Sequence, residues 1–597
     1  MPEAEMRTLA DLPFHVSGRY PKSSLVRRCT PDGYEESSSR QFFEDIRDCA
    51  LGLAGLGVRP GDHVALICET RPEWLVADFG ILTIGAVTVP IYPTLTPSLI
   101  GFILADAGAR VVIASTAEQA EKIREVRAEV PDLQEVVVID AEALAEGERS
   151  FAEIRERGHG RLMHENGLGR EYKEAARAIG EDQLATIIYT SGTTGTPKGV
   201  MLTHGAIVAN VVDANTLVAP HDTDEALSFL PLCHALERSV VYLYLYKGIT
   251  VTFAESLDTI ARDMVRVKPT IMTGVPRVFD KLHARILDAV AKAPAFRQML
   301  FRWAIGVSLE RSRAKLDGRE PSFLVRAQHG LADRLVCAKI RERVGGRLRF
   351  VVSGGAPLSR TVAEFLFAVG IPVLEGYGLT ETSPVLTVNP EHAPRLGTVG
   401  KALPRVELRI AEDGEILARG PNVMLGYYRQ PEATAEAIKD GWFHTGDIGR
   451  LDDDGYLIIT DRKKEILVTA GGKNVAPQPI ELQLRQHPLV GEAMLLGDGR
   501  RFVAALIVPD DAALRSQVGD SGETDLATLV ERSDVKTLYD DVVSAVNADL
   551  PKYEQLKRYA LLPTEFSQAT GELTPTMKVK RRVVAERWKD VVEELYA

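Results

Sequence analysis

Apolar and polar residues form blocks along the first half of the chain that indicate strands followed by helices. Short apolar runs rich in β-branched residues lie at 63–68, 85–90, 110–114 and 184–189. Helical spacing of apolar residues occupies 42–59, 99–107 and a segment around Glu73 and Asp78. Buried strands that alternate with helices of this length indicate βαβ units and a parallel sheet. We therefore predict an α/β fold, with surface helices in the charged stretch 118–177.

In the second half of the chain, the alternation of strands and helices continues and is then replaced, first by a β-rich segment and then by a small α+β domain. Further strands are predicted at 226–230, 348–352 and 372–374, with helices at 240–246 and 361–369 and a long helical region up to residue 343. Shorter strands with turn residues at 400–420 indicate a β-rich subdomain. Residues 461–465 form a charged patch between two apolar strands, which is typical of a linker. The predicted domains are residues 1–460 and a small α+β domain at 461–597.

The loop after the run 184–189 carries the sharpest motif. It reads Thr190-Ser191-Gly192-Thr193-Thr194-Gly195-Thr196-Pro197-Lys198-Gly199. Three glycines let backbone N–H groups face a ligand, five hydroxyls add donors, and Lys198 adds a cation, so the loop suits polyphosphate. The spacing differs from the Walker form, and a second strand at 199–202 follows instead of a helix. The alternative is a flexible surface loop.

Two further strands end in small, hydroxyl-bearing and acidic residues. Ser353 is followed by Gly354, Gly355 and Ala356; the other run is Glu375-Gly376-Tyr377-Gly378-Leu379-Thr380-Glu381. Ligands bind at the carboxyl ends of strands in doubly wound sheets, so we expect three loops to converge on one crevice. His234 follows another strand, where it either lines a ligand channel or caps a helix.

Composition narrows the class of protein. A net charge of −12 over 597 residues argues against general nucleic-acid binding, and five widely spaced cysteines give no disulfide framework or zinc site. No secretory signal and no apolar stretch of membrane-spanning length is found, so we expect a cytoplasmic protein.

Residues 297–349 are locally basic, with 13 Lys/Arg against 5 Asp/Glu. This stretch could contact an anionic membrane, at the inner membrane face, or a phosphorylated ligand. The alternative is an ordinary helix that packs on the core and has a solvated basic face.

Five motifs occur in a fixed order: residues 190–199, Tyr377-Gly378-Leu379-Thr380-Glu381, Thr445-Gly446-Asp447, Asp461-Arg462-Lys463-Lys464 and Pro575-Thr576-Met577-Lys578. This series resembles the core motifs of the adenylate-forming superfamily. Residues 440–464 together with 469–477 are most similar to long-chain fatty acyl-CoA synthetases. The resemblance implies a large N-terminal domain of doubly wound mixed sheets with a β-rich subdomain, and a mobile C-terminal lid that pivots near Asp461.

The resemblance also implies roles for individual residues. The 190–198 loop would hold the ATP phosphates, Glu381 would bind Mg²⁺, and Thr380 would contact the α-phosphate. Adenine would lie between residues 354–356 and 375–378, and ribose would bind Asp447 and Arg462. Lys578 would sit between the carboxylate and the α-phosphate. The acyl group or coenzyme A would contact His234, Lys464, Gly471, Gly472 and Lys473.

Three functions stay open at this point. The first is a long-chain fatty acid–CoA ligase that uses ATP, coenzyme A and Mg²⁺. The second is an acyl-AMP ligase that passes the acyl group to a carrier protein or an amine. The third is a non-catalytic nucleotide-binding or membrane-associated scaffold. Chain-length preference and oligomeric state are undetermined, with a homodimer as one option.

Overall fold

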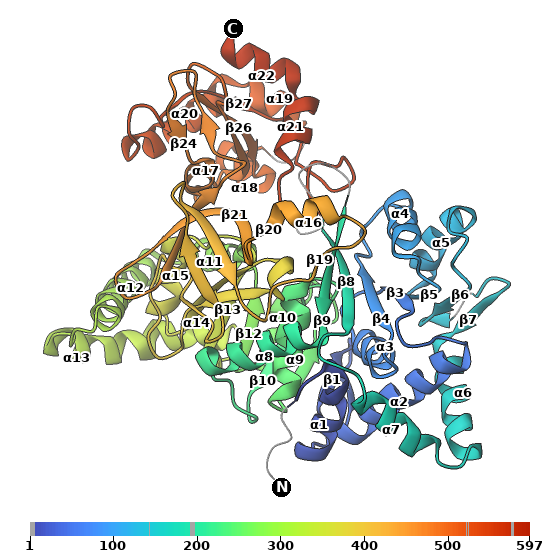
Figure 1. Cartoon of the computed structure of the whole chain (residues 1–597). Helices are drawn as coiled ribbons and strands as arrows, with labels where there is room; N and C mark the ends of the chain where they lie inside the picture. The colour runs from blue at the N-terminus through green and yellow to red at the C-terminus, as the bar shows by residue number, and fades with distance from the viewer. Residues whose placement is uncertain (1–5, 142–143, 191–196, 521, 523, 575–577) are drawn as a thin grey trace. The chain divides into compact units, whose positions relative to one another are not determined.

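The computed structural model describes residues 6–141, 144–190, 197–520, 522, 524–574 and 578–597 (Figure 1). It divides into two compact units. The N-terminal unit contains residues 1–409, 417–444 and 452–457, and the C-terminal unit contains residues 410–416, 445–451 and 458–597. The boundary at 460/461 that we expect from the sequence stays a prediction.

The first sheet of the N-terminal unit has, within the described residues, eight strands in the order β19-β9-β8-β4-β3-β5-β6-β7. Their bounds are β3 His63–Ile67, β4 Val87–Ile91, β5 Val111–Ala114, β6 Glu135–Val138, β7 Glu148–Ser150, β8 Leu184–Thr190, β9 Lys198–Thr203 and β19 Gly426–Tyr427. The strands from β8 to β7 are parallel, whereas β9 is antiparallel to β8 and β19 is antiparallel to β9. The two strands predicted on either side of the motif at 190–199, called the phosphate loop below, are confirmed as β8 and β9.

Helices accompany this sheet in the predicted alternation. They are α1 Leu12–Arg19, α2 Ser39–Gly55, α3 Pro72–Thr83, α4 Pro97–Ala107, α5 Ala117–Val126, α6 Phe151–His164 and α7 Leu168–Arg177. One expectation was incomplete, because the charged stretch 118–177 contains strands β6 and β7 besides helices. The run Val136 to Val138 is buried on the parallel sheet, and burial overrides the charged context.

The second sheet has, in the part of the chain that the structure describes, nine strands in the order β16-β15-β14-β13-β12-β10-β11-β1-β2. Their bounds are β1 Val26–Cys29, β2 Tyr34–Ser37, β10 Glu225–Ser228, β11 Thr250–Phe253, β12 Ile271–Gly274, β13 Phe350–Ser353, β14 Val373–Gly378, β15 Val385–Val388 and β16 Lys401–Ala402. Strands β1, β11, β10, β12, β13 and β14 are parallel, and the sheet is mixed because β2, β15 and β16 run antiparallel to their neighbours. The prediction of doubly wound mixed sheets is confirmed.

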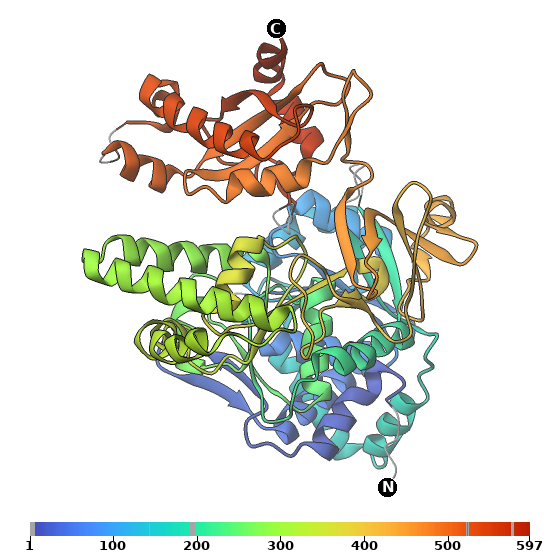
Figure 2. The same cartoon turned by 90° about the vertical axis from the view of Figure 1, so that its left-hand side faces the viewer.

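The helices of this second half are α8 His204–Val218, α9 Ala235–Tyr246, α10 Ile260–Val267, α11 Pro276–Ala291, α12 Ala295–Leu316, α13 Phe323–Ala332, α14 Ala338–Glu342 and α15 Arg360–Ala368. Helices α12 and α13 form a hairpin that extends outward from the sheet (Figures 1 and 2). On α12, Ala304 and Val307 are buried, whereas Met299 is exposed. The packing interpretation of this helix therefore holds for one of its faces.

A third sheet has the order β17-β18-β21-β20, with β22 paired to β21, among the described residues. The bounds are β17 Glu407–Ile410, β18 Glu415–Arg419, β20 Ile438–Lys439, β21 Trp442–Leu451 and β22 Leu457–Arg462; α16 spans Pro431–Ala437. One expectation changes here. Residues 442–451 form one continuous strand, and Asp461 and Arg462 end strand β22 instead of lying in a linker.

The remainder of the C-terminal unit combines two small sheets with helices. Its described strands are β23 Leu467–Val468, β24 Asn474–Val475, β25 Val490–Leu496, β26 Val503–Pro509 and β27 Leu556–Leu561. Its helices are α17 Pro477–Arg485, α18 Asp511–Val518, α19 Leu526–Glu531, α20 Ser533–Ala548, α21 Arg581–Arg587 and α22 Lys589–Tyr596. Strand β26 is buried at every residue, so this unit has an apolar core of its own.

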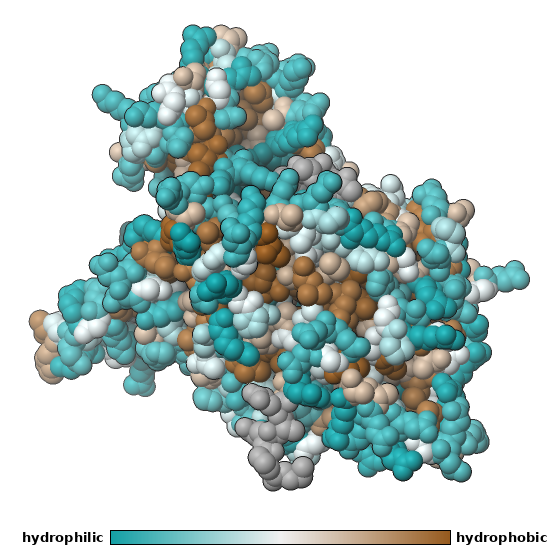
Figure 3. Space-filling view, viewed as in Figure 1, coloured by the Kyte–Doolittle hydropathy of each residue, from teal (hydrophilic) through white to brown (hydrophobic). Residues whose placement is uncertain are grey.

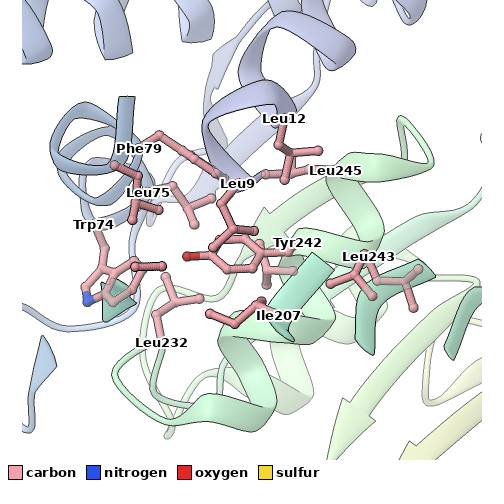
Figure 4. Close-up of a cluster of buried hydrophobic side chains, with 14 of the residues drawn as sticks. Leu9, Leu12, Trp74, Leu75, Phe79, Ile207, Leu232, Tyr242, Leu243 and Leu245 are labelled. Carbon is pink, nitrogen blue, oxygen red and sulfur yellow. The ribbon is translucent and has the colours of Figure 1, made fainter. Parts of the chain in front are cut away.

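The largest core cluster of the N-terminal unit surrounds helices α3 and α9 (Figure 4). Tyr242 and Tyr244 are buried there. An ion pair lies within the same core: Arg238 donates to Asp78 at 2.5 Å, and their side chains are 2% and 0% exposed. The Tyr242 hydroxyl also donates to Asp78. Buried charges of this kind are stable only when hydrogen-bonded partners compensate for lost hydration.

Candidate active site

Strands β8 and β9 hold the two ends of the phosphate loop. Thr190 and Lys198 are cross-strand neighbours in this antiparallel pair. The central loop residues Ser191, Gly192, Thr193, Thr194, Gly195 and Thr196 lie outside the described residues. Both strands are largely buried, so the sheet fixes where the loop begins and where Lys198 emerges.

Lys198 lies above the ring of Tyr427, with its Nζ 4.9 Å from the ring centroid. The Tyr427 hydroxyl donates a hydrogen bond of 2.9 Å to Oε1 of Glu381. Burial and the neighbouring Glu381 carboxylate raise the pKa of Tyr427 well above its ordinary value, so the phenol remains a neutral donor. One tyrosine thus links the phosphate-loop cation to the predicted metal ligand.

Sequence reasoning missed Tyr427 because its partners are far away in the chain. Strand β19 pairs with β9, and this pairing places Tyr427 opposite Val200. The local sequence Gly426-Tyr427-Tyr428, an aromatic pair after a glycine, is the only trace of this role in the chain segment itself.

The turn that carries Thr380 and Glu381 follows strand β14 directly. A Cβ atom on Gly378 would lie 1.8 Å from the carbonyl oxygen of Pro384, so only glycine fits the close approach of these two segments. The backbone of Glu381 is held as well, because its carbonyl accepts from the Met424 N–H at 2.8 Å. Residues 375–378, expected after the strand, form its last four residues instead, because β13 pairs with Glu375 and β15 pairs with residues 376–378.

Strands β13 and β14 bring the two predicted adenine-flanking segments together. Ser353 is the register partner of Glu375, and a Cβ atom on Gly354 would lie 3.7 Å from the Gly376 carbonyl oxygen. Gly355 adopts a positive φ of 85°, and both it and Ala356 are exposed, whereas Tyr377 is half-buried.

Glu375 is a titratable group in this part of the site. Burial raises the pKa of its carboxyl to about 7, although the Leu358 amide donates to it and opposes the shift. The group is therefore divided between its neutral and ionised forms near neutral pH.

His234 is the N-cap residue of α9. Its Nδ1 accepts a hydrogen bond of 3.2 Å from the Leu236 N–H, and the side chain is half-buried. Of the two sequence interpretations, the structure therefore supports helix capping. The following turn of α9 places Glu237 against β10, where the Ser228 hydroxyl donates to its Oε1 at 2.5 Å. Burial raises the pKa of Glu237 to about 8, so it is mainly protonated at neutral pH.

The predicted ribose pair lies on neighbouring strands of the C-terminal unit. Arg462 Nε is 3.1 Å from Oδ1 of Asp447. Asp447 is 4% exposed, so the pair is not an ordinary surface ion pair. The Thr445 hydroxyl accepts from the backbone N–H of Asp447 and donates to the Ile416 carbonyl, which fixes the backbone at Asp447.

Asp461 and Lys463 flank Arg462. Lys463 pairs with Asp413 at 2.6 Å and Glu415 at 2.9 Å. The Asp461 carboxylate accepts from the backbone N–H groups of Arg462 and Gln478, and burial raises its pKa to about 6. These contacts hold the end of β22, and sequence reasoning did not assign a role to Lys463.

The residues predicted for coenzyme A lie on exposed turns. Lys464 is exposed, and Gly471, Gly472 and Lys473 form the turn between β23 and β24. This turn is closed because the Thr469 N–H donates to the Lys473 carbonyl.

Lys578 follows residues 575–577, which lie outside the described part of the chain. Its N–H donates to the Thr574 hydroxyl at 2.9 Å, and its carbonyl accepts from the Thr574 N–H at 2.8 Å. Glu572, which precedes Thr574, is buried and accepts from Arg587 and from the Trp588 ring. Lys578 is exposed, so its side chain lies at the surface of the C-terminal unit.

The described residues contain no group of three or more His, Cys, Asp or Glu side chains placed to hold a metal ion. None of the helices in these residues combines the length and apolar character needed to cross a bilayer.

Similarity to known families covers both units. Residues 15–428 match the model of the AMP-binding enzyme family, and residues 464–597 match the AMP-binding enzyme C-terminal domain. The chain is 40% identical over 587 residues to the long-chain-fatty-acid–CoA ligase FadD15 of Mycobacterium tuberculosis, covering 96% of this chain and 95% of the relative. It is 34% identical to the peroxisomal long chain acyl-CoA synthetase 6 of Arabidopsis thaliana, covering 91% and 79%.

Solved structures agree on the fold. The adenylation domain of a carboxylate reductase from Mycobacterium chelonae has a TM-score of 0.73 at 23% identity, with 100% of this chain and 92% of that chain covered. The anthranilate CoA ligase AuaEII in complex with anthranoyl-AMP has a TM-score of 0.72 at 21% identity, with 98% of each chain covered. Together with the family models, which span both units in the expected order, these matches confirm the resemblance read from the five motifs: this chain is a member of the AMP-binding enzyme family.

Proposed function

We propose that the protein is a long-chain fatty acid–CoA ligase. The fatty carboxylate oxygen attacks the α-phosphorus of ATP, and pyrophosphate leaves to give an acyl adenylate. The sulfur of coenzyme A then attacks the acyl carbon, the C–O bond to the phosphate breaks, and AMP leaves. Full-length similarity to curated long-chain ligases supports this substrate class.

The observation that carries the proposal is the linkage of Lys198, Tyr427 and Glu381. The first step brings two anions together, so the enzyme must neutralise charge and align the reactants. Lys198 supplies a cation beside the phosphate loop, and Tyr427 orients the Glu381 carboxylate with a 2.9 Å hydrogen bond. Thr190 and Thr380 add hydroxyl donors on the same unit.

Mg²⁺ fits this carboxylate. Magnesium favours one or two protein carboxylates and takes its remaining ligands from phosphates and water. Glu381 is such a carboxylate, and the described residues hold no denser cluster of acidic groups or histidines. Glu381 would hold the ion, and the ion would supply positive charge to the ATP phosphates.

We assign the adenine and the ribose of the nucleotide to two further sets of residues. Residues 354–356 and 375–378 adjoin each other across β13 and β14, which suits a planar base against backbone. The buried Asp447 carboxylate, which pairs with Arg462, accepts from ribose hydroxyls, and Arg462 donates to the same sugar.

Lys578 is the proposed catalytic lysine for adenylation, delivered by the C-terminal unit. After adenylation, Lys464, Gly471, Gly472 and Lys473 serve coenzyme A, as the family resemblance implies. The experiment measures pyrophosphate release from ATP and a long-chain fatty acid, with and without coenzyme A. Acyl-CoA and AMP in equal amounts support the ligase; adenylate that accumulates despite coenzyme A indicates the acyl-AMP ligase instead. Absence of pyrophosphate release contradicts both.

We also propose a cytoplasmic enzyme that contacts the inner membrane face through residues 297–349. The basic charge of this stretch supports the contact. The homodimer stays a prediction.

A further inference from the structure

The hairpin of α12 and α13 has a tip built by a tight turn. Helix α12 ends at Leu316, and Gly318 adopts a positive φ of 66°, which suits the residue after a helix end. Helix α13 begins after Ser322, whose hydroxyl accepts from the Val325 N–H. Pro321, between the two helices, is buried and lines the cavity described next.

A cationic cavity of about 580 Å³ opens at this tip. Its charged and titratable lining residues are Arg311, Lys315, Arg319, Glu320, Arg326 and His329. Four permanent cations therefore face one lining carboxylate.

The ion pairs at the cavity leave an excess of positive charge. Arg326 pairs with Glu320 at 3.2 Å, and Arg319 pairs with Asp317 just outside at 2.7 Å. The carboxylates of Glu320 and Asp317 thus offset two of the four cations. All four paired side chains are more than half exposed, so these pairs contribute little and yield readily to a stronger anion.

The lowered pKa of His329 is consistent with the same positive environment. Burial lowers the pKa of its imidazole, and Arg311, Lys315 and Arg341 lower it further, while Asp333 opposes the shift. Arg311 Nη1 lies 3.5 Å from His329 Nε2. The cavity is therefore electrostatically suited to a compact anion such as a phosphate.

Two large apolar side chains lie in the chain between cavity-lining residues Pro321 and Arg326. Phe323 and Leu324, in the first turn of α13, are 75% and 69% exposed. Figure 3 shows tan and brown side chains at the left end of this hairpin, surrounded by hydrophilic ones. Apolar side chains at a cationic surface are the combination that binds the interface of an anionic bilayer.

We propose that the α12–α13 tip docks on an anionic phospholipid bilayer, with a headgroup phosphate in the cavity and Phe323 and Leu324 inserted among the acyl chains. The inference rests on the membrane contact proposed above and adds its site and its lipid chemistry. A bilayer is favoured over a soluble phosphate because the apolar pair needs an apolar partner.

Vesicle flotation with the full-length protein tests the docking. Wild type is expected to bind vesicles of phosphatidylcholine with phosphatidylglycerol and to bind vesicles of phosphatidylcholine alone much more weakly. The Arg319→Gln/Arg326→Gln variant should lose about thirty-fold in partitioning to anionic vesicles, as two removed surface charges predict. Its matched control, Arg302→Gln/Arg334→Gln, removes two exposed charges that do not line the cavity and should lose clearly less.

A second pair of variants tests insertion. Phe323→Ser/Leu324→Ser should weaken vesicle binding, whereas Leu331→Ser, an exposed leucine of the same helix, should not. Thermal midpoints and vesicle-free ligase activity should match wild type for all variants, which separates docking from folding and from chemistry.

Three results would overturn the inference. Equal losses in the cavity and control variants would leave a membrane contact without this site. Failure of wild type to float with anionic vesicles would remove the membrane contact and the site together, while the ligase assay still judges the enzyme function. Binding of inorganic phosphate or glycerol phosphate at Arg319 and Arg326 without vesicle binding would make the cavity a soluble-anion site.

Discussion

Tyr427 and Glu381 lie 46 residues apart in sequence, and a 2.9 Å hydrogen bond joins them. The phenol donates to Oε1 of the carboxylate that we propose as the Mg²⁺ ligand, which leaves Oε2 for the ion. This contact leads to the first prediction.

Tyr427→Phe should lower the rate of pyrophosphate release about ten-fold, because a hydrogen bond to a charged group contributes roughly 1.5–3 kcal/mol. The loss should shrink as Mg²⁺ is raised if Tyr427 acts by orienting Glu381. The matched control is Tyr428→Phe, whose ring contacts His63 and Arg429 instead. Equal losses in both variants would contradict the role of Tyr427.

Lys578→Ala should slow adenylation by about 10² to 10³, because the role proposed for the amine is to stabilise charge that develops only in the transition state. Thioester formation from supplied acyl adenylate and coenzyme A should remain near wild type. The two half-reactions are measured separately, with Lys589→Ala on the exposed surface of α22 as the control. Equal loss of both half-reactions would show that Lys578 does not act selectively in the first step.

His204 is expected to make the protein acid-sensitive. Its ring is fully buried, its nitrogens have no hydrogen-bond partner among the described residues, and burial together with Arg238 lowers its pKa to about 4. The unfolded chain binds the proton more tightly, with a pKa of about 6.5. Stability should therefore fall as pH drops below about 6.5, by about 2 kcal/mol between pH 7 and pH 5.

His204→Leu tests this assignment, since leucine fills a similar space without a titrating group. Urea unfolding of the variant should show a smaller loss between pH 7 and pH 5 than wild type. His221→Leu, at an exposed histidine, should retain the wild-type pH dependence. If the two variants behave alike, His204 is not the source of the acid sensitivity.

Glu237 predicts the opposite pH trend. Its folded pKa of about 8 exceeds the ordinary carboxyl value, so the folded state holds its proton more tightly than the unfolded chain. Stability should fall as pH rises, by about 3 kcal/mol between pH 6 and pH 9 from this group. Glu237→Gln keeps the acceptor for Ser228 and should abolish this component in urea unfolding. An unchanged slope in Glu237→Gln, measured beside the exposed control Glu310→Gln, would refute it.

Local patterns predicted the elements that bury a continuous apolar face. The pair β8 and β9, the alternation of strands and helices up to β5, and the separate C-terminal sheet all follow from apolar periodicity and glycine positions. Motif order predicted which side chains would gather, and the Asp447–Arg462 pair is one example that the structure contains.

Long-range pairing explains what the sequence did not reveal. Tyr427 reaches Glu381 only because β19 joins β9, and no local pattern encodes that contact. The Asp78–Arg238 pair is likewise 160 residues apart, and each residue alone resembles a surface charge. Residues 442–451 form a strand because they pair with neighbours, despite their turn-forming composition.

The Arg238 guanidinium joins three elements of the N-terminal unit. It belongs to α9, binds Asp78 of α3 and donates to the Thr186 hydroxyl of β8 at 2.8 Å. Strand β8 ends at Thr190, and α9 begins next to His234. A displacement of either residue is therefore transmitted to elements that bind the same buried guanidinium. Substitutions around His234 must therefore leave Arg238 and its partners intact, because a displacement of α9 would reach strand β8 through the same guanidinium.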